Sequence, residues 1–76
     1  SAARAFAERF IGRTMQVLWE TGDRGQWSGY TDNYIRVMAE SNANLHNRLL
    51  RAKLAALDRD AVNASLMQEE LRVSLV

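Results

Sequence analysis

Apolar and polar residues alternate along much of the chain, a pattern typical of strands that bury one face. Met15, Val17 and Trp19 alternate with polar neighbours, and Leu18 is the one apolar residue out of step. Successive side chains of a strand point to opposite faces, so this pattern predicts a strand from about 13 to 20. Met15, Val17 and Trp19 are expected to face the core.

The first eleven residues have helical spacing instead. The apolar residues on one helical face are Ala2, Ala3, Phe6 and Phe10. Gly12 follows and is suited to ending a helix. We therefore expect residues 1–11 to be the tail of a preceding helix or a linker.

Turn-forming residues divide the next segments. The stretch 21–26 holds two glycines and two charged residues, and Trp27–Tyr30 returns as a short strand. These features predict a hairpin over 13–30. A second turn is expected at 31–33, followed by a strand at 34–39 in which the side chains alternate. Its inward residues are Ile35 and Val37, and its outward residue is Arg36.

The segment from Leu45 to Leu57, after a polar loop at 40–44, fits two elements. At helical spacing the apolar stripe is Leu45, Leu49, Ala52 and Ala56. The residues are strong helix formers and Asn42 or Asn44 is able to cap, so local propensity favours a helix. At period two the inward residues are Leu50, Ala52, Leu54 and Ala56, and the outward residues are Arg51 and Lys53.

The end of the chain contains one turn and one further strand. Asp58-Arg59-Asp60 is a tight polar turn, and the alternating residues after it are Val62, Ala64 and Leu66. A capping box at 65–68 offers a short helix as the alternative. Residues 67–76 are compatible with a strand, a helix or a tail.

Composition limits the chain to one small domain. It has 76 residues, no cysteine and one histidine, His46. These numbers exclude disulfides, thiolate zinc sites, cysteine-ligated clusters and cysteine nucleophiles, and leave too few histidines for most metal or catalytic sites. The hydrophobic fraction of 47% argues against disorder.

No run approaches the roughly 20 apolar residues of a spanning helix, and no secretory leader is recognisable. We therefore expect a soluble, cytoplasmic protein with no membrane partner. The chain begins Ser-Ala-Ala without methionine, which suggests a piece of a longer protein.

The net charge is +1, which rules out nucleic-acid binding by bulk charge alone. Nine of the ten basic residues are arginine, and only Lys53 is lysine. Arginine forks onto phosphates and stacks on bases. Genomic codon bias explains the same composition equally well.

Aromatic residues lie among arginines in the predicted sheet. The aromatic residues are Trp19, Trp27, Tyr30 and Tyr34, interleaved with Arg13 and Arg36. Single-stranded RNA is recognised by such rings and guanidinium groups. The alternative is that the rings are core, which the phase favours for Trp19 and leaves open for Tyr30 and Tyr34.

The outward phases of two strands suggest a basic stripe of Arg36, Arg51 and Lys53, to which Arg13 and Arg48 add. The alternative is a solvated face balanced by Asp32, Glu40 and Asp58. Convergence of the stripe on open surface would favour RNA, and scatter or ion pairing would favour protein docking.

Three further groups complete the candidate chemistry. Asn33 suits either a base edge or an Asx-turn that holds its own backbone. His46 is expected to be a loop residue, since no second metal-binding side chain lies at useful spacing. No convincing catalytic carboxylate pair is present. By itself the fragment is expected not to be an enzyme.

Two blocks of sequence resemble the TRAM domain. The first is Phe10–Glu20 (FIGRTMQVLWE), followed after a turn by Trp27–Val37 (WSGYTDNYIRV). The second, weaker block covers 45–54 and 56–62. More narrowly, the chain is similar to the C-terminal TRAM segment of radical-SAM tRNA methylthiotransferases of the MiaB family, and GYTDNYIRV is closest to the MtaB-like branch.

The resemblance implies a mainly β fold, a small antiparallel OB-like barrel over 12–66 in which 45–57 is a strand. TRAM segments commonly have glycine where this chain has Asn47 and Asn63. Asparagine tolerates a left-handed backbone better than other non-glycine residues, so the turns are expected to survive.

The resemblance also implies a function. The domain would hold the tRNA anticodon arm while a separate radical-SAM domain methylthiolates N6-threonylcarbamoyladenosine. The RNA-binding residues would be Arg13, Tyr30, Asn33, Tyr34, Arg36, Arg48, Arg51 and Lys53. The parent enzyme would use 4Fe-4S clusters and S-adenosylmethionine, with no cofactor in this fragment.

The implied partners are tRNA and the radical-SAM and N-terminal domains of the same polypeptide, and the fragment is expected to be a monomer. Two alternatives stay open. One is a structural domain that docks onto the rest of its own enzyme without RNA contact. The other is a helical bundle, which rests on the helix propensity of 45–57.

Overall fold

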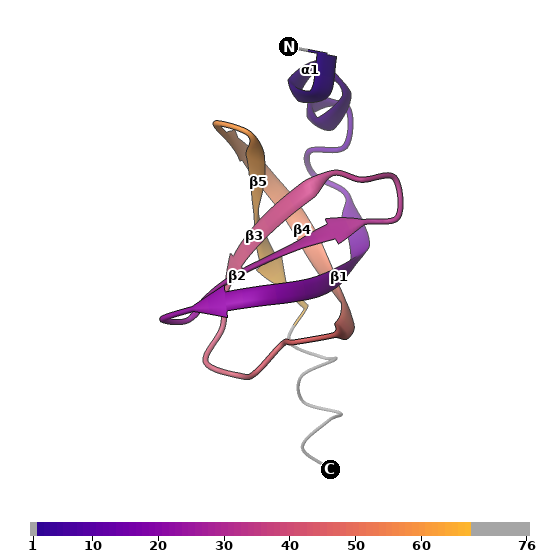
Figure 1. Cartoon of the computed structure of the whole chain (residues 1–76). Helices are drawn as coiled ribbons and strands as arrows, with labels where there is room; N and C mark the ends of the chain where they lie inside the picture. Colours follow the sequence, from indigo (N-terminus) through magenta and orange to yellow (C-terminus); the bar gives the residue numbers. More distant parts are fainter. Residues whose placement is uncertain (1, 68–76) are drawn as a thin grey trace.

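Five strands close into a barrel, and one short helix lies at one end of it (Figure 1). The structure is a computed structural model that describes residues 2–67. The elements are α1 (Ala2–Glu8), β1 (Thr14–Asp23), β2 (Gln26–Thr31), β3 (Arg36–Glu40), β4 (Arg48–Asp58) and β5 (Ala61–Leu66).

The strand order around the barrel is β1-β2-β3-β5-β4, and β4 pairs back with β1. Only the β3–β5 pair is parallel, and the other four pairs are antiparallel. A closed five-stranded barrel of this kind is OB-like. The predicted mainly β, OB-like barrel is confirmed, with one parallel pair that the prediction did not include.

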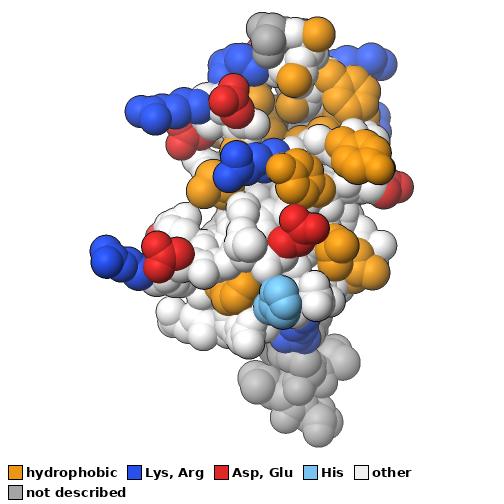
Figure 2. All heavy atoms as spheres, viewed as in Figure 1, with side chains coloured by type: hydrophobic (Ala, Val, Ile, Leu, Met, Phe, Trp, Pro, Cys, Tyr) orange, Lys and Arg blue, Asp and Glu red, His pale blue; other side chains and the backbone are white. Residues whose placement is uncertain are grey.

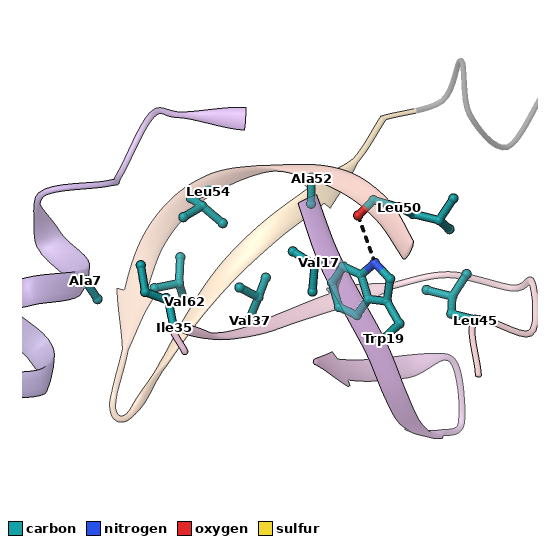
Figure 3. Close-up of a cluster of buried hydrophobic side chains, with 11 residues drawn as sticks. Ala7, Val17, Trp19, Ile35, Val37, Leu45, Leu50, Ala52, Leu54 and Val62 are labelled. Atoms are coloured by element: carbon teal, nitrogen blue, oxygen red, sulfur yellow. Dashed lines mark hydrogen bonds between the residues drawn. The ribbon is translucent and has the colours of Figure 1, made fainter. Parts of the chain in front are cut away.

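Alternation along β1 builds the centre of the core. Val17 and Trp19 are fully buried, as predicted. The Trp19 indole Nε1 donates a hydrogen bond to the carbonyl oxygen of Leu50, at 3.3 Å (Figure 3). A buried indole needs such a partner, because an unpaired polar group is costly away from water.

β4 decides between the two interpretations of 45–57, and the helix favoured by local propensity is wrong. Leu50, Ala52 and Leu54 are buried at period two. β4 pairs with β1 on one side and with β5 on the other. Backbone pairing on both edges, together with a buried face, outweighs a weak local preference for helix.

The first hairpin has a shorter turn than the sequence predicts. β1 continues to Asp23, and the turn consists of Arg24 and Gly25, which have φ of 55° and 81°. Two successive left-handed residues match the twist of a two-residue hairpin. Gly22 belongs to the strand instead, where the Trp27 ring occupies the space of its missing side chain.

The N-terminal helix is present but ends at Glu8 rather than near Gly12. Its expected apolar face is also wrong in phase: Ala7 is the buried residue and Phe6 is exposed. α1 contacts β4, where Ala7 joins the core cluster, and Phe10 packs against that cluster in part. The Gly12 amide donates to the carbonyl of Leu54, at 2.7 Å, which fixes the start of β1.

The last strand confirms the alternation predicted around Val62 and places 65–66 in β5 rather than in a helix. Its turn, Arg59-Asp60, lies where Asp58-Arg59-Asp60 was predicted. The alternatives for the tail beyond Met67 concern residues 68–76, which lie outside the described residues.

Asn47, where TRAM segments commonly have glycine, adopts a left-handed backbone with φ of 59°, whereas Asn63 lies within β5 and not in a turn. Its amide donates to the Trp19 carbonyl, at 2.9 Å, just before β4 begins. We expect Asn47→Ala to lower the free energy of unfolding by about 1 kcal/mol, because alanine is strained in this region, and Asn47→Gly to cost nothing. Urea denaturation followed by circular dichroism measures both. Equal losses in the two variants would show that the asparagine side chain matters rather than its backbone.

Candidate functional site

An open groove of about 1000 Å³ lies on the outer face of the barrel, over β1. We name it the β1 groove. Its lining residues are Arg13, Thr14, Met15, Gln16, Leu18, Glu20, Tyr30, Thr31, Asp32, Tyr34 and Leu49. They come from β1 and the residue before it, Arg13, from the two neighbouring strands β2 and β4, and from the loop between β2 and β3. The groove therefore collects residues that are far apart in the sequence.

An apolar row crosses the β1 groove. Leu18 pairs with Tyr30 of β2 on one side and with Leu49 of β4 on the other. All three are exposed, and Leu49 retains 57% of its accessible surface. Figure 2 shows one face of the molecule, on which hydrophobic side chains reach the surface beside charged ones. The row explains why Leu18 is out of step: it lies on the outer face.

The loop between β2 and β3 holds Tyr34 at the rim of the groove. Tyr34 is 85% exposed and has a φ of 67°. A left-handed backbone costs a non-glycine residue roughly 1–2 kcal/mol. The strand predicted for 34–39 begins at Arg36, so Tyr34 belongs to the turn and not to the sheet.

Asn33 lies inside the same turn. Its Oδ1 accepts a hydrogen bond from the hydroxyl of Thr31, at 2.5 Å. The side chain thus holds the turn through a neighbouring hydroxyl rather than through the backbone N–H of an Asx-turn. The side-chain oxygen Oδ1 of Asn33 is therefore already hydrogen-bonded within the loop.

Basic groups gather at one end of the groove. The Arg13 guanidinium lies over the Phe10 ring, with 5.4 Å from Cζ to the ring centroid. On β4, Lys53 pairs with Thr14 and Arg51 pairs with Gln16, so both basic residues stand beside groove-lining positions. We name Arg13, Arg51 and Lys53 the basic end. A guanidinium stacked on a ring keeps its N–H groups available for phosphate.

The other predicted site residues lie apart from the basic end. Arg36 is exposed on β3, where it pairs with Tyr30 across the sheet. β3 and β4 are not neighbours in the barrel, so Arg36 does not form one stripe with the basic end. Arg48 pairs with Trp19, which points inward, and is half-buried at the start of β4. Its phase removes it from the groove face.

Acidic groups also line the groove. Glu20 lies at the end of β1 away from Arg13, and Asp32 directly follows β2. Carboxylates repel phosphate, so an anionic backbone is favoured at the basic end rather than beside Glu20. His46 confirms its expected place in a loop: its Nδ1 lies 2.7 Å from the Glu20 carbonyl oxygen, which only accepts, so Nδ1 carries the hydrogen.

The sequence does not indicate Leu18 and Leu49 as groove residues. In the sequence, Leu18 is an irregularity in its strand and Leu49 fits a helical stripe. The available signal was an apolar residue on the outward phase of each strand, because exposed apolar rows mark interaction surfaces. Gln16 and Thr14 gave no signal, since polar residues are normal on an outer face.

Within residues 2–67, no group of three or more His, Cys, Asp or Glu side chains is arranged to hold a metal ion. No helix in the part of the chain that the structure describes is long and apolar enough to cross a membrane. The side chains that line the β1 groove offer stacking, apolar contact, hydrogen bonding and charge.

Comparisons with known proteins identify no family. No family model matches the chain, and no curated protein matches it significantly. The resemblance to TRAM domains stays a prediction. The fold and the chemistry of the groove are the observations that bear on function.

Proposed function

We propose that this chain is an RNA-binding module that holds an unpaired segment of RNA along the β1 groove. One observation carries the proposal: an OB-like barrel presents exposed aromatic and apolar side chains in a single groove that Arg13 lines, and Lys53 and Arg51 border it through their pairing with Thr14 and Gln16. Barrels of this class bind oligonucleotides on their strands and loops. Single-stranded nucleic acid needs this pairing of stacking surface and positive charge.

Each part of the groove has a distinct task in this proposal. Bases rest on Tyr30, Tyr34 and Leu18, and stacking of a base on an aromatic ring contributes about 1–3 kcal/mol. Phosphates lie at the basic end, where arginine forks onto two phosphate oxygens. The charge is local, so a net charge of +1 for the chain is no obstacle.

The resemblance to TRAM segments supports a narrower proposal. The RNA would be the anticodon arm of a tRNA, and the module would belong to a cytoplasmic radical-SAM tRNA methylthiotransferase. The clusters, the S-adenosylmethionine and the methylthiolation of N6-threonylcarbamoyladenosine would belong to other domains. This chain would supply affinity and orientation.

An amide NMR titration with an anticodon stem-loop at low and moderate salt tests the proposal. We expect shifts at Arg13, around Leu18, at Tyr30–Arg36 and at 49–53, because these residues line or border the groove. The shifts should fade as salt rises, since phosphate contacts release counterions. An absence of shifts at low salt would contradict RNA binding.

A second candidate function is docking onto the rest of the same polypeptide. One observation that favours it is the apolar row of Leu18, Leu49 and Tyr30, which resembles a protein-contact surface as much as a base-contact surface. Another is that Arg36 lies apart from Arg51 and Lys53, so these basic residues do not converge on one stripe. Leu18→Ser with Leu49→Ser separates the two. Unchanged RNA affinity in that variant, with lost binding to the remaining domains, would favour docking.

A further inference from the structure

We propose that residues 31–35, here named the Tyr34 turn, form a preorganised platform that captures one unpaired base on the Tyr34 ring, and that Thr31 is its positioning residue. The inference rests on the proposed RNA-binding function and narrows its substrate to nucleotides whose base is not already stacked. It also assigns a role to Thr31, which lines the groove but is only 3% exposed.

Tyr34 has a strained backbone that the packing of its side chain does not explain. Its backbone is in the left-handed region, with φ of 67°, where glycine or asparagine is the usual residue. Its side chain is 85% exposed, so the ring gains little from packing in the fold. Strained conformations persist where the surroundings impose them and are concentrated at binding sites.

Hydrogen bonds to Thr31 impose this conformation on Tyr34. The Thr31 amide donates to the Ile35 carbonyl, and the Ile35 amide donates to the Thr31 hydroxyl, each at 3.0 Å. The Tyr34 amide donates to the Thr31 carbonyl, also at 3.0 Å. Thr31 therefore bonds through its amide, its carbonyl and its hydroxyl within one turn.

The hydrogen-bonded residues Thr31 and Ile35 are themselves anchored in the barrel. Thr31 is 3% exposed and Ile35 is 5% exposed, so the two ends of the turn are fixed in the core while Tyr34 projects between them. The Thr31 hydroxyl also donates to Asn33, which closes the network. The hydrogen bonds of the turn therefore fix the position of Tyr34, and none of them involves its ring.

The position of the ring indicates the ligand. Tyr34 lines the β1 groove together with Tyr30, and the next residue across the sheet from Tyr30 is Arg36. A ring at the rim of a groove offers a face to a base that has left its stack, whereas both faces of a base inside a duplex are covered. Arg36 stands on the outward phase where a flanking phosphate would lie.

Two variants of Tyr34, compared with the wild type, test the platform, with an anticodon stem-loop and a fully paired RNA duplex as probes. Tyr34→Gly is expected to bind the stem-loop about 10-fold more weakly, by loss of one stacking contact. It is also expected to raise the melting temperature by about 4 °C, because glycine relieves the strain. Tyr34→Phe is the matched control and should retain both wild-type values. The duplex should bind weakly to all three proteins.

The positioning role of Thr31 is tested by substituting it both in the wild type and in the Tyr34→Gly variant. Thr31→Val removes the hydroxyl at nearly constant volume and should weaken stem-loop binding about fivefold, and Thr31→Ser should restore it. In a Tyr34→Gly background, Thr31→Val should cause no further loss of affinity, since a positioning residue acts only through the group it positions. A full additional loss in that background would overturn the role of Thr31.

The outcomes separate this inference from the proposed function. If wild-type protein fails to bind the stem-loop, RNA binding itself is wrong. If wild-type protein binds but Tyr34→Gly binds equally well, or melts at a lower temperature, the platform is wrong and RNA binding stands. Equal affinity of the wild type for duplex and stem-loop would also overturn the platform.

Discussion

Gly29→Ala is expected to lower the free energy of unfolding of the barrel by a large fraction of its total. A Cβ at Gly29 would lie 2.2 Å from the carbonyl oxygen of Leu18 and 2.9 Å from the Cα of Trp19. Both are backbone atoms of β1, so no side-chain rotation relieves the overlap. We expect a loss of about 3 kcal/mol or more in the free energy of unfolding, against roughly 4–11 kcal/mol for a domain of this size. Urea denaturation followed by circular dichroism measures it.

Gly12→Ala is the matched control for this prediction. Gly12 has a φ of 92°, but no heavy atom lies within 4 Å of where a Cβ would stand. The substitution therefore carries only the cost of the left-handed backbone, about 1 kcal/mol. If the two variants were equally stable, the close approach of β1 to Gly29 would not limit the fold.

The Gly29 contact also matters for the groove. Gly29 pairs with Trp19, and a register shift follows between Trp19 and Thr21. The close approach at Gly29 is next to the pair Leu18 and Tyr30, whose exposed side chains form part of the apolar row. A variant that folds with a wider β1–β2 spacing should lose groove binding as well as stability. The glycine therefore links the packing of the barrel to the shape of its outer face.

The local pattern of the sequence predicted where most strands lie, but it did not predict which strands pair with one another. Alternation identified β1 through Val17 and Trp19, and the turn at Asp58-Arg59-Asp60 marked the end of β4. The state of β4 was not readable from its own residues, because alanine and leucine favour helix and only pairing with β1 and β5 makes the segment extended. The resemblance to TRAM segments, not the propensity, anticipated this strand.

Three of the residues that the sequence suggests as RNA-binding, Arg13, Tyr30 and Tyr34, lie together in the lining of the groove. Their role in binding stays a prediction. Leu18 and Leu49 enter the groove because β2 and β4 flank β1, which is a long-range fact that the sequence does not state. Tyr34 owes its exposure to a left-handed backbone that a strand assignment for 34–39 hides.

Removal of the basic end is expected to have the largest effect on binding. In the triple variant Arg13→Gln, Arg51→Gln and Lys53→Gln, affinity for an anticodon stem-loop at low salt should fall on the order of 100-fold. The slope of log affinity against log salt should also decrease by about 2, because three contacts to single-stranded phosphates are lost. Fluorescence anisotropy across a salt series measures both quantities. Glutamine keeps much of the side-chain length, so the loss reports charge rather than packing.

A second triple variant separates a local site from bulk attraction. Arg9→Gln, Arg24→Gln and Arg59→Gln remove the same charge from exposed positions outside the groove lining. If RNA is held at the basic end, this control keeps most of the affinity, because none of these three arginines lines the groove or pairs with a residue that lines it. Equal losses in the two triple variants would mean that the RNA samples the whole surface. The β1 groove would then be a surface for protein contact, with Leu18 and Leu49 as its centre.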